Sequence, residues 1–150
     1  MTGTHANARL APMAFVVLAL LALLLGGFSL FVGYNKALAP LEVLREHSAW
    51  TYHLPVLLGR VIGWVEIVAA AVLILGLFVP SLRRAGVWSA VWITLNHAVA
   101  AVVHVIFEEW HTLTQSAVVI TLCLVMVWLY RKHAAARVLT QFHRQRRMRG

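Results

Sequence analysis

Four long apolar stretches, separated by short polar segments, make up most of the chain. No charged residue occurs between Arg9 and Lys36, and residues 12–33 form an apolar run. At about 1.5 Å per residue, this run is long enough to cross a bilayer core of about 30 Å. Three further runs follow, at residues 55–79, 85–107 and 113–130. The last three runs are joined by links of about five residues, so consecutive helices should be antiparallel neighbours.

Composition excludes the main alternatives. Apolar residues make up 61% of the chain, against about 45–50% in soluble domains, and only 12% of residues are charged. A disordered chain would need low hydrophobicity and high charge, and a soluble enzyme would not gather its apolar residues into four runs. The single cysteine, Cys123, lies inside the last run. It excludes a disulfide framework and a thiolate metal site, and it argues against a thiol oxidase.

We therefore expect an all-α membrane protein, an antiparallel bundle of four transmembrane helices over residues 12–130. A segment at 1–11 precedes it and a basic tail at 131–150 follows it. A cleaved signal peptide is the alternative for the first run, because residues 37–39 resemble a small-residue cleavage site. The length of the run and the three spans that follow favour a retained helix.

The distribution of basic residues predicts the orientation. Lys36 and Arg45 lie on one side of the predicted bundle, with Arg60 just inside the second helix. The other side carries the ten remaining Lys and Arg residues: Arg9, Arg83, Arg84, Arg131, Lys132, Arg137, Arg144, Arg146, Arg147 and Arg149. Basic flanks stay in the cytoplasm, so both termini are expected there, in a bacterial plasma membrane. The expected aromatic belts are Tyr34, Trp50, Tyr52 and Trp110 outside, and Trp88, Trp128 and Tyr130 inside.

The tail at 131–150 contains seven Lys or Arg residues and no acid. Such a segment is expected to lie on anionic lipid. RNA binding is the alternative, but no aromatic stacking module accompanies the charges. We therefore expect no nucleic-acid partner.

Glu66 lies near the middle of the second predicted helix, where a charge is costly. Gly59, Gly63 and Ala70 share its face, so another helix can approach it closely. The carboxyl group should face the bundle, either protonated or paired with Lys36, Arg60 or a histidine. Both a packing role and a functional role, such as proton transfer, stay open at this point.

The third predicted helix carries Asn96 and a row of histidines at seven-residue spacing, His97, His104 and His111, with Glu108 four residues after His104. A metal, a haem or a proton path can be built along such a row. In the simpler interpretation, His97 bonds a neighbouring helix and the other two meet interfacial water. Because neither an HExxH pattern nor a cysteine pair is present, we expect no tightly bound metal or haem.

The outer end of the bundle is expected to form a polar pocket covered by the connection at residues 34–54. Lys36, Arg45, Arg60, His53, His104, Glu108 and Glu109 should gather there. A quinone head group, a lipid head group or a partner subunit would fit such a pocket, although interfacial solvation explains the same residues.

Several short motifs resemble the DoxX-like family over roughly residues 14–131. They are Gly33-Tyr34-Asn35-Lys36, Arg60-x-x-Gly63-x-x-Glu66, Leu73-x-Leu75-Gly76-Leu77-Phe78-x-Pro80, and His104. The resemblance maps the recurrent lysine of the family onto Lys36, its arginine and acid onto Arg60 and Glu66, and its histidine onto His104. The usual glycine-rich stretch after the acid is replaced here by residues 67–71, Ile-Val-Ala-Ala-Ala.

The resemblance implies a four-helix membrane protein. Some DoxX-like proteins resemble subunits of quinone-linked oxidoreductases, and others accompany redox-stress complexes or receptor-assembly chaperones. We therefore expect a small accessory or anchoring subunit, not an enzyme on its own, that works with other membrane subunits or with copies of itself and offers a surface for quinone or lipid. A proton-coupled carrier using Glu66 and His97, and a structural or chaperone-like partner, are the alternatives.

Overall fold

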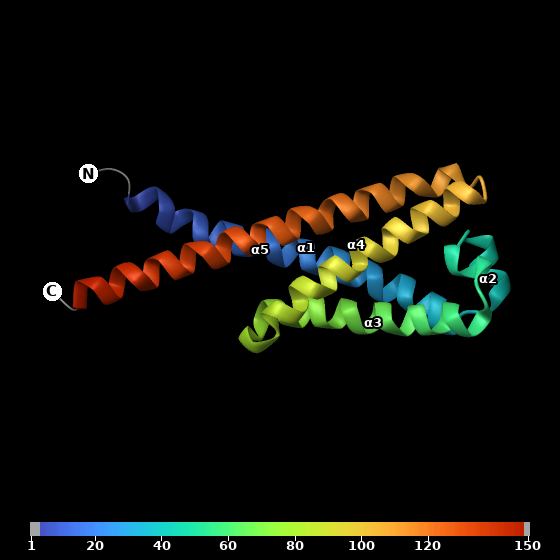
Figure 1. Ribbon diagram of the computed structural model, residues 1–150, viewed down its shortest axis with the longest axis horizontal. Helices are drawn as coiled ribbons and strands as arrows, with labels where there is room; N and C mark the ends of the chain where they lie inside the picture. The colour runs from blue at the N-terminus through green and yellow to red at the C-terminus, as the bar shows by residue number, and fades with distance from the viewer. Residues whose placement is uncertain (1–3, 149–150) are drawn as a thin grey trace.

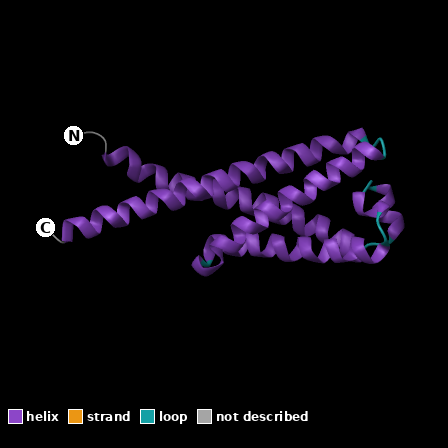
Figure 2. Ribbon diagram, viewed as in Figure 1, coloured by secondary structure: helices purple, strands orange, loops and turns teal. Residues whose placement is uncertain are grey.

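The computed structural model describes residues 4–148, with side chains placed for residue 13 and residues 15–131, and all regular elements in this part are helical (Figures 1 and 2). The long helices are α1 (Thr4–Leu38), α3 (Val56–Phe78), α4 (Arg83–Ile106) and α5 (Leu113–Met148). Short elements connect them: α2 (Leu41–Glu46) and the 3-10 turns η1 (Trp50–His53), η2 (Pro80–Leu82) and η3 (Trp110–Thr112).

The four long helices run antiparallel in sequence order, as predicted (Figure 1). The start of α1 and the end of α5 lie at one end of the bundle, and α2 lies at the other (Figure 1). Four segments are long and apolar enough to span a membrane: Phe15–Leu38, Val56–Phe78, Pro80–Ile106 and Trp110–Arg131. The all-α fold with four membrane-spanning helices is therefore confirmed for the described residues.

Two helices are longer than the sequence predicted. Helix α1 continues past residue 33 to Leu38, which places Lys36 in the helix and not in the connection. It stops there because Pro40 cannot donate a backbone hydrogen bond and disfavours helical backbone at the residue before it. Helix α5 continues from the fourth span to Met148. We expect the basic tail to contact anionic lipid. Its side chains after Arg131 lie outside the described residues.

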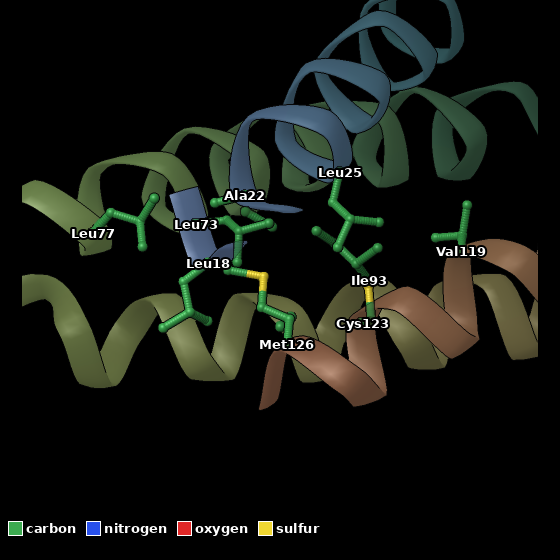
Figure 3. Close-up of a cluster of buried hydrophobic side chains, with 11 residues drawn as sticks. Leu18, Ala22, Leu25, Leu73, Leu77, Ile93, Val119, Cys123 and Met126 are labelled. Atoms are coloured by element: carbon green, nitrogen blue, oxygen red, sulfur yellow. The ribbon is translucent and has the colours of Figure 1, made fainter. Parts of the chain in front are cut away.

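The apolar core fills the half of the bundle nearest the chain ends. Side chains from all four long helices meet there, with those of α1, α3 and α5 pointing toward one another (Figure 3). The buried members are Leu18, Ala22, Leu25, Ala69, Leu73, Leu77, Ala90, Ile93, Val119, Cys123 and Met126. Large apolar side chains also cover the outer surface of each helix, as Leu20, Leu57, Leu95 and Leu124 illustrate. This outer surface suits contact with lipid chains.

Helices α1 and α3 approach most closely at Gly33 and Gly63. A Cβ atom on Gly63 would lie 2.5 Å from the backbone nitrogen of Ala37, and one on Gly33 would lie 2.9 Å from the carbonyl oxygen of Gly63. Only glycine fits at such a backbone contact. The predicted small-residue face of α3 is buried along its length. This crossing fixes the position of Lys36 relative to the next helix.

Candidate functional site

A cavity of about 280 Å³ lies in the half of the bundle nearest α2, beyond the apolar core. Its walls come from α1, α4 and the first turn of α5, and α2 and η1 cover it. Its lining combines the apolar rings of Phe28, Phe31 and Trp50 with polar groups, those of Lys36, His97, His104 and Ser116. A pocket was predicted under the first connection, and the cavity lies there. Of the seven residues expected to gather in it, Lys36 and His104 line the cavity, whereas Arg45, Arg60, His53, Glu108 and Glu109 do not.

A buried ion pair between α1 and α3 lies beside this cavity. The Nζ atom of Lys36 is 2.7 Å from Oε2 of Glu66, and the two residues are 3% and 0% exposed. The same Nζ atom lies 5.5 Å from the ring centroid of Trp50, within the range of a cation–π contact. The structure thus selects Lys36 among the partners that the sequence left open for Glu66.

The second oxygen of Glu66 has a different environment. Oε1 is buried and has no hydrogen-bond partner among the described residues. A carboxylate away from water normally accepts several hydrogen bonds. Among the described residues, Lys36 is therefore the hydrogen-bond partner on which the Glu66 carboxyl group relies, which makes the pair sensitive to loss of either member.

Arg60 supports the pair without touching Glu66. Its Nη1 atom donates a hydrogen bond to the carbonyl oxygen of Lys36, at 3.0 Å. In a continuing helix this carbonyl would accept from the N–H four residues later, but that position is Pro40. Arg60 replaces the missing donor and ties the end of α1 to the start of α3.

The outer end of α4 differs from the sequence prediction. Glu108 was expected to share a face with His104, but the helix ends at Ile106 and Glu108 adopts φ 59°. The backbone N–H of Glu109 then donates to the carbonyl of His104 at 2.8 Å, a Schellman-type ending. This turn carries the neighbouring carboxylate, that of Glu109, back to the helix, and it places His111 in η3, off the predicted row.

Glu109 joins two histidines from different elements. Its Oε2 atom lies 2.6 Å from Nδ1 of His104, and its Oε1 atom lies 3.4 Å from Nε2 of His53. His53 also stacks on Phe107, with ring centroids 3.7 Å apart. Because an ionised carboxylate only accepts hydrogen bonds, both histidine nitrogens carry the proton. The network holds the end of η1 against the end of α4, at the edge of the cavity.

The pKa of Glu109 is set by opposing effects. Burial alone raises it, but the hydrogen bonds from His104 and His53 and the charges of these two rings outweigh burial and hold the pKa below its usual range. A carboxyl group with a lowered pKa stabilises the fold above its unfolded-state pKa and loses that contribution as the pH falls through the folded-state value.

We therefore expect the thermal midpoint of the purified protein to fall as the pH drops below about 4.5, the ordinary pKa of the carboxyl group. Glu109→Gln should lower the free energy of unfolding at pH 7 by about 1 kcal/mol, less than the loss of a fully buried charged hydrogen bond would. It should also reduce the fall of the thermal midpoint at acidic pH. Glu108→Gln is the matched control, since Glu108 is exposed. Identical pH profiles for wild type and Glu109→Gln would show that Glu109 does not hold the two elements together.

His97 and Asn96 are buried near the middle of α4. His97 lines the cavity and packs against the ring of Phe28, with centroids 6.1 Å apart. Its Nε2 atom and the side-chain nitrogen of Asn96 have no hydrogen-bond partner among the described residues. The expected hydrogen bond from His97 to a neighbouring helix is therefore not made by this atom.

Trp50 does not lie where the sequence analysis predicted. It was assigned to the outer aromatic belt, but it is 6% exposed and lines the cavity, whereas Tyr34, Tyr52 and Trp110 are exposed. The chain turns back after α2 through Ser48, whose φ is 47°. This turn, another Schellman-type ending, points η1 inward.

The described histidine, cysteine and carboxylate side chains form no group of three that could hold a metal ion. His104 and His53 meet one carboxylate, that of Glu109, and His97 lines the cavity together with Lys36 and His104.

These features define a small multi-pass helical membrane protein with a polar cavity inside its bundle. The family model described as the DoxX-like family matches residues 17–127. The chain belongs to the DoxX-like family, as the motifs predicted. Searches of curated proteins and of solved structures gave no match.

Proposed function

We propose that this DoxX-like protein is a small accessory or anchoring subunit of a quinone-linked membrane oxidoreductase, and that its cavity receives the polar head of a quinone. The observation that carries the proposal is the cavity itself. It lies between membrane-spanning segments and combines aromatic walls with Lys36, His97 and His104. Small-ligand sites commonly pair an apolar lining with a few placed polar groups.

The orientation and the partners belong to the same proposal. With both termini in the cytoplasm of a bacterium, the cavity lies in the outer leaflet half, and the basic tail contacts anionic lipid on the inner side. The apolar outer surface of the four helices supplies the area on which other membrane subunits, or a second copy, can pack.

Affinity purification from membranes in a mild detergent, followed by mass spectrometry, tests the subunit role. We expect subunits of a redox enzyme to be enriched together with the chain. The matched control is the Glu66→Leu protein. Because it lacks the ion pair that joins α1 to α3, it should lose these partners.

Two results would contradict the proposal. Enrichment of a client with no redox centre would favour the chaperone-like interpretation. Proton-coupled uptake of a solute by liposomes that contain the purified chain alone would favour a carrier, with Glu66 and His97 as its titratable groups.

A further inference from the structure

Two buried ring nitrogens at the cavity lack a hydrogen-bond partner within the described part of the chain. They are Nε2 of His97, on the α4 wall, and Nε1 of Trp50, in the covering turn η1. His97 is 4% exposed and Trp50 is 6% exposed. Native proteins rarely leave buried polar atoms unpaired, so each such atom needs an explanation. A ligand in the cavity supplies one explanation for both atoms.

The chemistry of the two rings restricts the ligand. An indole N–H can only donate, so Trp50 requires an acceptor such as a carbonyl oxygen. A neutral imidazole has one donor and one acceptor nitrogen, so His97 can bind a carbonyl oxygen or a hydroxyl group. A head group with two oxygen atoms, at least one of them an acceptor, satisfies both residues. Quinones meet this requirement with two carbonyl oxygens on opposite sides of one ring.

The mouth of the cavity lies on the side of the bundle. Phe31 of α1 lines the cavity and yet is 69% exposed, and Gln115 of α5 also lines it and is exposed. Both residues belong to membrane-spanning segments. The side of the opening between α1 and α5 therefore faces the bilayer, while His47 of the first connection, which is also exposed, borders the cavity at the end nearest α2.

The volume agrees with a ligand that is only partly enclosed. At about 280 Å³, the cavity is slightly smaller than the roughly 300–1,000 Å³ of small-molecule pockets. It has room for a polar ring but not for a long apolar tail. The tail would have to leave through the lateral mouth, past Phe31, into lipid.

We propose that a quinone enters from the bilayer between α1 and α5, binds with one ring oxygen at His97 and the other at Trp50, and leaves its tail among the lipid chains. This inference rests on the proposed function for the class of ligand. It adds the residues that recognise the head group and the route by which the ligand enters.

Photolabelling in lipid nanodiscs tests the inference, with decylubiquinone as competitor and two azide-bearing quinone probes. An azide on the ring should label peptides that contain Trp50 or His97, and an azide at the end of the tail should label peptides of α1 or α5 near Phe31 and Gln115. Decylbenzene, which has the same tail but no oxygen atoms, should not compete.

Variants give the second measurement. Trp50→Phe removes the indole N–H, and His97→Phe keeps a ring without a hydrogen-bonding nitrogen. Each should weaken competition by decylubiquinone about tenfold, the effect of losing one hydrogen bond. The matched controls are Trp64→Phe and His111→Phe, which change exposed rings and should bind as wild type does.

The outcomes distinguish failure of the recognition inference from failure of the proposed function. If wild type is labelled saturably, but Trp50→Phe and His97→Phe bind normally or the ring probe labels other helices, the recognition inference is wrong and the proposed function stands. If decylubiquinone does not compete for labelling of wild type, quinone binding itself fails. If either variant does not fold, the labelling map of wild type still decides the question.

Discussion

Glu66→Leu is expected to destabilise the protein by about 3–5 kcal/mol, the usual cost of breaking a buried ion pair from one side. The substitution leaves the ammonium group of Lys36, 3% exposed, without the carboxylate that lies 2.7 Å away. Glu66→Gln should also destabilise, because an amide keeps the shape but loses the charge. Thermal unfolding in detergent, followed by the onset of aggregation, measures both effects.

The double variant Lys36→Met/Glu66→Leu should recover a substantial part of this loss, because no unpaired charge stays buried. Glu46→Gln is the control, since Glu46 is exposed at the end of α2. If Glu66→Leu and Glu66→Gln unfold like wild type and keep their partners, Glu66 has no structural role. The carrier interpretation, in which Glu66 carries a proton, would then move ahead.

Gly63→Ala is expected to cost about 1–3 kcal/mol or more, as overpacking of a tight contact does. The new Cβ atom would lie 2.5 Å from the nitrogen of Ala37 and 2.8 Å from the carbonyl carbon of Lys36. These are backbone atoms, so relief requires the two helices to separate, which also stretches the ion pair. The measurement is again the thermal midpoint in detergent.

Gly27→Ala is the matched control on the same helix pair. A Cβ atom at Gly27 meets nothing within 4 Å. In a helix, alanine is favoured over glycine by about 0.5–1 kcal/mol, so this variant should be neutral or slightly more stable. Equal destabilisation by both substitutions would contradict the close α1–α3 contact.

Much of the fold follows directly from the sequence. Four long, mostly apolar runs leave few alternatives to spanning helices, and short links force antiparallel neighbours. The contact face of α3 could also be predicted, because Gly63 and Ala70 flank Glu66, an acid that could not face lipid. Burial of Glu66 required a basic partner or a proton, but nothing in the spacing alone distinguished Lys36 from Arg60.

The outer end of the site could not be derived in the same way. Its geometry depends on two left-handed residues, Ser48 and Glu108, at positions where glycine or asparagine would give a recognisable signal. Without that signal, helical spacing assigned Glu108 to His104, whereas the turn brings Glu109 there. For the same reason Trp50 was interpreted as a belt residue, although the turn at Ser48 carries it into the cavity.

The hydrogen bond made by Arg60 could not be predicted from the local sequence around Pro40 alone. The sequence shows that Pro40 leaves a carbonyl near the end of α1 without its helical donor. It does not show which group replaces that donor, because Arg60 lies on the next long helix. The buried ion pair and this cap together account for the positions of Lys36, Arg60 and Glu66 between α1 and α3.

The most direct test of the central claim is the quinone content of the protein taken from its own membrane without detergent. The chain is extracted in polymer-bounded native nanodiscs, and quinone and phospholipid are measured in the same sample. We predict a quinone-to-phospholipid ratio several-fold above that of nanodiscs from the bulk membrane, with the excess lost in Trp50→Phe and kept in Trp64→Phe. A ratio equal to that of the bulk membrane would contradict the account.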